Sequence, residues 1–456
     1  MKKIILLFCI LLYFTGAKAQ TLWEALPLKF DQAPSRMYYD SIEQSSYIYS
    51  LFSIVNDTTC NIVRVNPNGS HVLMPQTPHT YNICMLRYND TLFVGGDKGL
   101  IYWNGGDWTI VDTSLLVSSM LAYQGKLLVT GSLADPEETS LYSWDGSTWT
   151  SNIYGADTLY TGGGAGYLTA EYKGELYIAG NFNNTVDTAI DDIARFDGTR
   201  WQSVGGQIDG DALTHITKML IWKDTLYVSG AFKESLGSPG NAIAQWDGQQ
   251  WHRMGKGLNQ SYPSATDMVV FNDALYVTGF FHDVNGMNPV PQAGKGLAKW
   301  DGSKWCTMGT TADLQIVNVG RTKNSLFVMG GFEIINGDTC INIAKWIGGD
   351  YTDSCSLAID DPTALKDHGT LIQTQLSAYP NPTTGTLQIS YFNRTTKKLA
   401  TLKIVDAVGK IVSNSSFKVE QGSNQFSIDM TGMPAGLYLI ELRNGEQKSI
   451  AKFIKN

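Results

Sequence analysis

Carboxylates cluster in two short stretches of the chain, and these stretches are the ones best suited to chemistry. Residues 187–192 are Asp-Thr-Ala-Ile-Asp-Asp, and residues 209–211 are Asp-Gly-Asp. Carboxylate oxygens that lie close together can hold Ca²⁺, and a pair of carboxylates can hydrolyse a glycosidic bond. Neither stretch has the Asp-x-Asp-x-Asp-Gly pattern of a calcium loop, and a chain with 42 Asp and Glu residues supplies carboxylate pairs by chance. We therefore interpret both stretches as solvated loops and expect no metal site.

Other patterns of catalytic residues are missing from the sequence. The six histidines are scattered, and none belongs to a His-Glu-x-x-His motif. No Gly-x-Ser-x-Gly nucleophile motif and no glycine-rich phosphate loop occurs. We therefore expect no catalytic residues and no cofactor, and we favour a binding protein. Two alternatives stay open: an extracellular carbohydrate-active hydrolase or lyase, and a structural adhesion component.

A repeat with a period near 50 residues must position any site in the main body. One clear copy is Leu226-Tyr-Val-Ser-Gly230, followed by a loop and then by Ile243-Ala-Gln-Trp-Asp-Gly-Gln-Gln-Trp251. Self-similarity at such a period indicates a repeat architecture. Each unit has signals for four strands, and tight turns such as Lys223-Asp224 join the first to the second and the third to the fourth. The second strands begin at Leu92, Leu127, Leu176, Leu226, Leu275 and Leu326.

Four antiparallel strands repeated around an axis form a β-propeller, whose blades pack through large side chains. A degenerate unit at residues 47–69 precedes the six clear copies, and the last copy lacks its fourth strand. Residues 21–26 look like that missing strand, so we expect an N-terminal strand to complete the last blade and close the ring. The expected fold is all-β, with a seven-bladed propeller over residues 20–357 and six blades as the alternative. The glycine-ended strand and the Asp-Gly-x-x-Trp unit resemble kelch and galactose-oxidase-like propellers.

Ligand-binding residues are expected on one face of the disc. The tight turns crowd one face, so the second-to-third and blade-to-blade loops share the opposite face. Exposed loops on a rigid scaffold are where binding residues usually lie. The repeat tryptophans are expected to fill the space between blades rather than to stack on sugars. For an unidentified glycan or protein ligand, the candidate binding residues are Asp191, Asp209, Asp211, Tyr262, His282 and Asp283.

Residues 1–19 have the three parts of a secretory signal peptide. Lys2 and Lys3 precede an apolar core at residues 4–14, and Ala17-Lys-Ala19 supplies a small-x-small cleavage site. No other segment approaches the ~18 apolar residues of a transmembrane helix, so no transmembrane anchor is expected. Residues 20–377 hold 21 Lys and Arg residues against 37 Asp and Glu residues. A body this acidic repels phosphate backbones, so nucleic acid is not an expected partner.

The sequence pattern changes after a linker at residues 358–375. Residues 376–456 contain six or seven short alternating strands, which are typical of a small Ig-like β-sandwich. These residues also resemble the C-terminal sorting domain of type IX secretion system (Por secretion system) cargo in Bacteroidetes. The residues that carry this resemblance are Tyr379, Pro380, Asn381, Pro382, Gly385, Gly409, Gly436, Lys452 and Lys455.

The resemblance implies an export route and a set of partners. The signal peptide would deliver the chain to the periplasm, where the type IX secretion translocon recognises the tail. A sorting peptidase would then remove the tail, and the cargo would be secreted or held at the outer-membrane surface by lipopolysaccharide. In this scheme the sorting domain carries no catalytic residues.

Two covalent features are also expected. Five cysteines remain after signal cleavage, and this odd number leaves at least one thiol free or paired elsewhere. Cys340 and Cys355 flank the last repeat, so we expect a disulfide between them. The triplet Asp-Thr-Leu, which contains Thr91 and Thr225, resembles an O-glycosylation site of Bacteroidetes. A hairpin turn entering a strand explains the same triplet equally well.

Overall fold

The computed structural model describes residues 21–456 except 133–138, 152–153, 155–167, 184–189, 206–207, 209–214, 237, 260–261, 286, 288–295, 353, 358–375, 380–381, 394–398, 407–409, 421 and 445–446. The chain forms two compact units, Met1–Ala358 and Ile359–Asn456. Among the described residues, no helix is long and apolar enough to cross a membrane.

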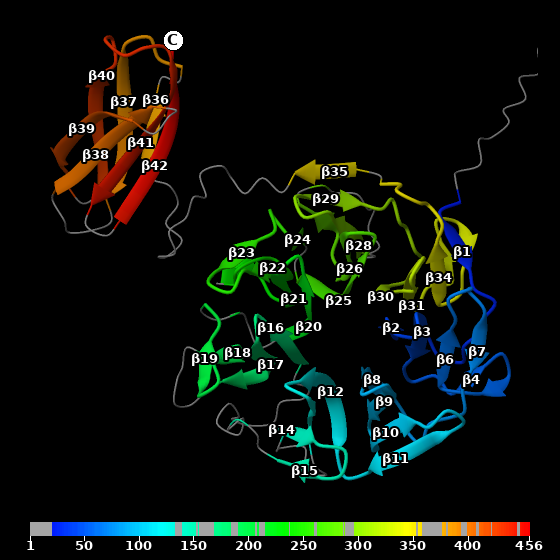
Figure 1. Ribbon diagram of the computed structural model, residues 1–456. Coiled ribbons are helices and arrows are strands. Elements are labelled where there is room, and N and C mark those ends of the chain that lie inside the picture. Colours follow the sequence, from blue (N-terminus) through cyan, green and yellow to red (C-terminus); the bar gives the residue numbers. More distant parts are fainter. Residues whose placement is uncertain are drawn as a thin grey trace, which may run out of the picture. The chain divides into compact units, whose positions relative to one another are not determined.

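Seven sheets of four or five strands surround one axis in the described part of the first unit, and each sheet is a propeller blade (Figure 1). Blade 1 contains β2 (Arg36–Asp40), β3 (Ser45–Tyr49), β6 (Ile62–Val65) and β7 (His71–Leu73). Blade 2 contains β8 (Asn82–Tyr88), β9 (Thr91–Gly96), β10 (Gly99–Trp103) and β11 (Trp108–Asp112). Blade 3 contains β12 (Leu116–Tyr123), β13 (Lys126–Ser132), β14 (Thr139–Trp144) and β15 (Trp149–Thr150).

The remaining four blades repeat this order from the axis outward. Blade 4 contains β16 (Leu168–Tyr172), β17 (Glu175–Asn183), β18 (Asp191–Phe196) and β19 (Trp201–Ser203). Blade 5 contains β20 (His215–Trp222), β21 (Thr225–Ala231), β22 (Ile243–Trp246) and β23 (Trp251–Arg253). Blade 6 contains β25 (Ser264–Phe271), β26 (Ala274–Phe280), β28 (Gly296–Trp300), β29 (Lys304–Thr307) and β35 (Ser354–Leu357). Blade 7 contains β30 (Ile316–Arg321), β31 (Leu326–Gly330), β34 (Ile343–Trp346) and β1 (Trp23–Ala25).

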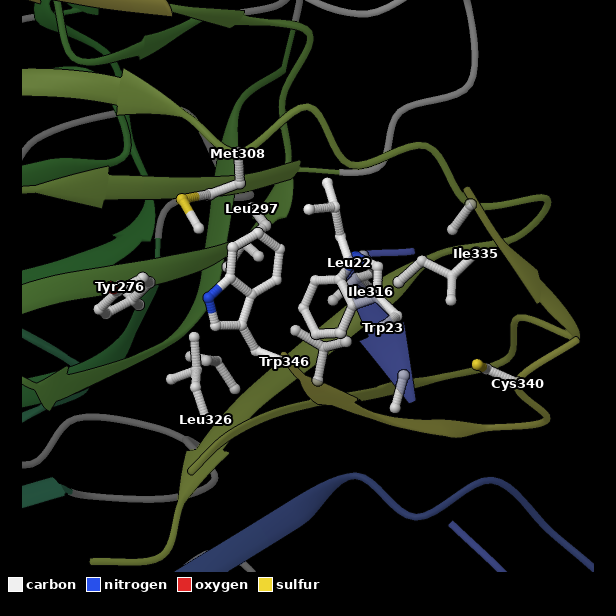
Figure 2. Packing of buried hydrophobic residues seen from close by; sticks show 14 of the residues in the cluster. Leu22, Trp23, Tyr276, Leu297, Met308, Ile316, Leu326, Ile335, Cys340 and Trp346 are labelled. Carbon is white, nitrogen blue, oxygen red and sulfur yellow. The ribbon is translucent and has the colours of Figure 1, made fainter. Parts of the chain in front are cut away.

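The N-terminal strand β1 closes the ring, as the sequence predicts. It is the outermost strand of blade 7 and pairs antiparallel with β34, so that Trp23 lies opposite Trp346. Their rings lie 4.9 Å apart, edge to face, among buried side chains that include Leu22, Leu326 and Met308 (Figure 2). Blades 5 and 6 make the same tryptophan pair within one chain segment, with ring centroids 5.2 Å apart. The seven-bladed ring is therefore confirmed, and the two ends of the propeller together form its last repeat.

The glycine that ends the second strand has a steric cause. In blade 5 the innermost strand β20 has a β-bulge between Ile216 and Lys218, opposite Gly230 of β21. A Cβ on Gly230 would lie 2.2 Å from the carbonyl oxygen of His215, which is too close for any side chain. Blades 3, 6 and 7 combine the same bulge with a glycine in the same place. Bulges bend a strand and are often retained for that purpose.

Aromatic side chains join neighbouring blades by hydrogen bonds as well as by packing. The second tryptophan of blade 5, Trp251, donates from Nε1 to the carbonyl oxygen of Val204 at 2.6 Å. Trp305 of blade 6 donates in the same way to Met254 at 2.8 Å. The repeat tryptophans therefore lie between blades, as the sequence predicts, and their indole N–H groups are satisfied by the preceding blade in these two cases.

The predicted disulfide between Cys340 and Cys355 is wrong, because Cys355 is bonded to Cys306. After blade 7 the chain runs back to blade 6, where β35 adds a fifth strand to the outer edge of β29 (Figure 1). This pairing places Cys355 directly opposite Cys306. Cys340 is a buried free thiol within blade 7. The bond therefore fixes the C-terminal end of the propeller to blade 6.

The second unit is a sandwich of two antiparallel sheets. One contains β36 (Leu376–Tyr379), β37 (Thr386–Asn393) and β40 (Gly422–Asp429). The other contains, in spatial order, β39 (Ile411–Lys418), β38 (Leu399–Asp406), β41 (Gly436–Asn444) and β42 (Gln447–Lys455). Alternate apolar residues of these strands form one buried core, which includes Ile389, Leu402, Ile440 and Phe453. This arrangement confirms the predicted β-sandwich.

Candidate functional site

The longer connections of the propeller lie together on one side of the disc, which we call the loop face. The first two strands of each of several blades are joined by two-residue turns with positive φ, such as Asn89-Asp90 and Lys223-Asp224. These turns define the opposite, hairpin face. Because strands alternate in direction, the second-to-third loops and the blade-to-blade loops must share the loop face.

Asparagine side chains fasten pairs of connections on the loop face. Asn56, Asn285 and Asn336 all have positive φ and lie in second-to-third loops of blades 1, 6 and 7. Each accepts a hydrogen bond at Oδ1 from a backbone N–H of the preceding blade-to-blade loop, at 2.7 to 2.8 Å. A buried phenylalanine lies four residues before each asparagine. This Phe-x-x-Val/Ile-Asn pattern is a local sequence signal for such a fastened loop.

The loop face has an open depression of about 480 Å³ between blades 5 and 6. One part of its described lining is the second-to-third loop of blade 5, which contains the 3₁₀ turn η2 (Glu234–Leu236). The other part is β24 (Leu258–Asn259), which lies in the loop between blades 5 and 6. The lining side chains are all polar or charged, namely Lys233, Glu234, Ser235, Asn241 and Asn259. Polar groups that converge in a concavity can orient a bound ligand.

Hydrogen bonds hold the two amide side chains of the depression in place. Asn241 accepts from the Glu234 N–H at 3.1 Å and donates from Nδ2 to the carbonyl oxygen of Lys256 at 3.0 Å. Asn259 donates from Nδ2 to the same oxygen at 2.9 Å. The amides therefore link the blade 5 loop to the loop between blades 5 and 6. Side chains fixed in this way lose little conformational entropy when a ligand binds.

Charged and aromatic groups complete the site. Arg253 of β23 pairs with Glu234, with an Nη1 to Oε1 distance of 2.6 Å. The Nζ of Lys233 lies 4.5 Å from the ring centroid of Tyr262, a cation–π contact. Tyr262 is 67% exposed, more than any other large hydrophobic side chain among the described residues. The depression thus has an exposed aromatic ring next to fixed polar groups.

The structure brings three of the six predicted binding residues to this region. Tyr262 contacts Lys233, a lining residue. His282 and Asp283 lie beside Asn259, because β27 (Asp283–Val284) pairs with β24 and the His282 N–H donates to the Asn259 carbonyl oxygen at 3.1 Å. His282 also has a buried Nδ1 without a hydrogen-bond partner.

The other three predicted binding residues are not part of this group. Asp191 belongs to β18 of blade 4, where its backbone pairs with Asn183. Asp209 and Asp211 lie outside the described residues. Most of the lining residues were not among the predicted binding residues. Lys233, Glu234, Ser235 and Asn241 belong to the second-to-third loop of blade 5, and its contact with the loop between blades 5 and 6 has no strong sequence signal.

The aspartates of the Asp-Gly turns have structural roles. In the Asp-Gly turns of the hairpin face, Asp197 accepts hydrogen bonds from the hydroxyl and N–H of Thr199 and from the Arg200 N–H. These bonds hold the pKa of the Asp197 carboxyl well below its usual value. Asp247 occupies the same turn in blade 5, where burial raises its pKa but hydrogen bonds, led by the one from His252, lower it to about 2. Among the described residues, no group of three or more His, Cys, Asp or Glu side chains is suited to hold a metal ion.

The predicted glycosylation sites lie at the hairpin face. Thr91 and Thr225 each follow a two-residue turn, and each is partly buried as the first residue of a strand. Their hydroxyls lie 3.4 Å from the carbonyl oxygens of Asn89 and Lys223. Both interpretations of the Asp-Thr-Leu triplet fit this geometry, and modification stays a prediction.

Three residues of the predicted sorting motif lie at the ends of sandwich strands. Tyr379 ends β36, Gly436 begins β41 and is exposed, and Lys455 ends β42 and is mostly buried. Pro382 and Lys452 are exposed, and Gly385 is partly buried. Pro380, Asn381 and Gly409 lie outside the described residues.

Comparison with known families identifies the second unit. Residues 377–456 match the family model described as "Secretion system C-terminal sorting domain". The chain therefore carries a type IX sorting domain, is handled by the type IX secretion translocon, and is exported to the cell surface or the extracellular space. Among curated proteins, no sequence matches this chain.

Two solved structures resemble the chain at low similarity. The acylaminoacyl peptidase of Pyrococcus horikoshii is 11% identical with a TM-score of 0.45, and the match covers 80% of this chain and 59% of the peptidase, so the chain spans less than two thirds of that enzyme. An exo-β-1,3-galactanase of Phanerochaete chrysosporium is 8% identical with a TM-score of 0.30, over 77% of this chain and 96% of that one. With TM-scores this low, neither structure carries an argument about activity or ligand.

Proposed function

We propose that this secreted propeller binds an extracellular ligand, a glycan or a protein, at the depression between blades 5 and 6. The observation that carries the proposal is a concavity of the loop face with fixed amide side chains, next to an exposed Tyr262 that contacts the lining residue Lys233. The scaffold beneath is rigid, because buried tryptophans and interblade hydrogen bonds hold its blades together. A rigid scaffold with a polar concavity on its loops suits recognition.

We further propose that the site binds without chemistry of its own. Glu234 is the one carboxylate among the described lining residues, and Arg253 is paired with it. Glycoside hydrolysis by the usual route uses two carboxylates on opposite sides of the scissile bond. An extracellular hydrolase or lyase remains the alternative function, and a structural adhesion component is the other. Turnover of a polysaccharide that is abolished by a single carboxylate substitution would favour the enzyme.

The binding site can be tested with substitutions on the two faces of the disc. A soluble full-length chain is screened against polysaccharides and extracellular proteins, and each ligand found is then titrated against Lys233→Ala and Asn259→Ala variants. Lys126→Ala, an exposed residue next to a hairpin turn, is the matched control. We expect weaker binding only for the two loop-face variants, with melting temperatures within a few degrees of the parent. Equal binding by all three variants would exclude the depression as the site.

Three finer features also belong to this proposal. Removal of the tail by a sorting peptidase and attachment to lipopolysaccharide are inferred from the presence of the sorting domain. The closer resemblance to kelch and galactose-oxidase-like propellers rests on the sequence pattern of the repeat. Mass spectrometry of the exported protein tests the first two directly, because it measures the mature C-terminus and any attached group.

A further inference from the structure

We propose that Tyr262 is a stacking platform for a sugar ring and that the depression takes a neutral, hydroxyl-rich oligosaccharide. This inference rests on the proposed binding function and narrows it to one class of ligand. Stacking would place the apolar C–H face of a pyranose on the tyrosine ring, while the neighbouring side chains bind the hydroxyl groups.

Tyr262 differs from the other aromatic residues of the repeat units. Trp246, Trp251, Trp300 and Trp305 are buried between blades. Tyr262 lies outside the repeat pattern, in the loop before β25, and exposes 67% of its surface. What sets Tyr262 apart is its place, because its exposed ring contacts Lys233, a lining residue of the depression. A ligand that occupies the depression can therefore reach the ring.

Lys233 keeps the ring oriented. Its ammonium group lies 4.5 Å from the ring centroid and covers part of one side, which restrains the tyrosine without burying it. An aromatic residue that is already restrained costs little entropy on binding. The cation–π contact thus supports a preformed platform rather than a loosely held side chain.

The charges around the depression favour a ligand without net charge. The charges of Arg253 and Glu234 compensate each other in an ion pair, and Lys233 contacts the Tyr262 ring. Residues 20–377 as a whole carry 16 more acidic than basic residues, so a polyanion would be repelled before reaching the site. A uronic-acid polymer does not match this charge distribution.

The lining and size fit a carbohydrate better than a protein surface. Amide, hydroxyl and carboxylate groups offer both donors and acceptors, which sugar hydroxyls require. The volume of about 480 Å³ lies within the range of about 300–1,000 Å³ that is typical of small-ligand pockets. A stable protein interface needs about 1,000 Å² or more with an apolar centre, whereas this lining is polar.

The test compares two substitutions of the same residue in the full-length chain. Binding is measured by isothermal titration with a neutral panel (β-glucan, mannan, xylan, galactan and starch) and an acidic panel (alginate and polygalacturonate). We expect at least one neutral polysaccharide to bind. Tyr262→Ala should weaken that binding by about ten-fold or more, whereas Tyr262→Phe, which keeps the ring, should stay within about three-fold of the parent. Melting curves of both variants should match the parent, since Tyr262 is exposed.

Three outcomes would overturn the inference. These are no binding of any neutral polysaccharide, binding of the acidic panel alone, or equal affinity of Tyr262→Ala and the parent. A protein ligand that is lost in Lys233→Ala, with no polysaccharide bound, would leave the proposed function standing and reject the carbohydrate. The binding site itself would be rejected as well only if Lys233→Ala and Asn259→Ala also bound every ligand found as tightly as the parent does.

Discussion

Replacing Gly230 with alanine measures how closely the two innermost strands of blade 5 approach each other. The added Cβ would lie 2.2 Å from the His215 carbonyl oxygen and 3.0 Å from the Ile216 Cα. Because non-bonded heavy atoms prefer separations of about 3.5 Å, the strands must separate by about 1 Å to admit the methyl group. Overpacking of this kind costs about 1–3 kcal/mol, and the reduced entropy of the unfolded chain offsets about 0.4–1 kcal/mol of that cost. We expect a net loss of about 1–2 kcal/mol.

The matched control is Gly106→Ala, at a turn where the nearest atom to the new Cβ is Asn104 Oδ1 at 3.8 Å. Urea unfolding of the two variants, followed by tryptophan fluorescence, gives their midpoints relative to the parent. Gly230→Ala should unfold at lower urea, and Gly131→Ala should do the same, because its Cβ would lie 2.2 Å from the Leu116 carbonyl oxygen. The steric account of the repeat glycine is refuted if Gly230→Ala and Gly106→Ala share one midpoint.

Four further outcomes are expected. Trp23→Ala removes a buried ring from the closing strand and should destabilise the propeller by about 3–5 kcal/mol in urea unfolding, a loss that a purely flexible N-terminus would not show. The double variant Cys306→Ser/Cys355→Ser opens a loop with a sequence separation of 49 residues and should cost about 4 kcal/mol relative to the parent; equal stability of the double variant and the parent would contradict the bond. Burial lowers the pKa of His79 to about 4, against the smaller raising effect of Asp97, so the neutral form is favoured in the folded state. Stability from this group is complete above about pH 6.5 and falls by about 3 kcal/mol as the pH drops to about 4, and His79→Gln should flatten that part of the pH–stability curve. Deletion of residues 376–456 should leave a folded propeller in the periplasm, and normal amounts of the truncated protein in the medium or at the cell surface would contradict the sorting role.

The fold was largely predictable because its signals are repeated and local. Six of the seven blades repeat a glycine-ended strand, and the missing last strand leaves a gap that Trp23 fills opposite Trp346. The disulfide was not predictable in the same way. Cys355 reaches Cys306 only because the chain returns to the outer edge of blade 6, and nothing near Cys355 in the sequence specifies that route.

The candidate site was predictable only in part, since it depends on contacts between loops. Tyr262 was selected as a residue of a long loop, and its exposure agrees with that choice. His282 and Asp283 come next to Asn259 because β24 pairs with β27, a two-residue ladder without a sequence signal of its own. The asparagines that fasten the loops, such as Asn285, do have a local signal in the phenylalanine four residues earlier.

Amide hydrogen exchange of the full-length chain, with and without a bound ligand, tests most directly whether the loop face at blades 5 and 6 is the binding site. The account predicts slower exchange on ligand addition at the described lining residues Lys233, Glu234, Ser235, Asn241 and Asn259. It predicts no change at the hairpin turns 89–90 and 223–224, which lie on the opposite face. Protection confined to those hairpin turns, or none around the depression at saturating ligand, would contradict it.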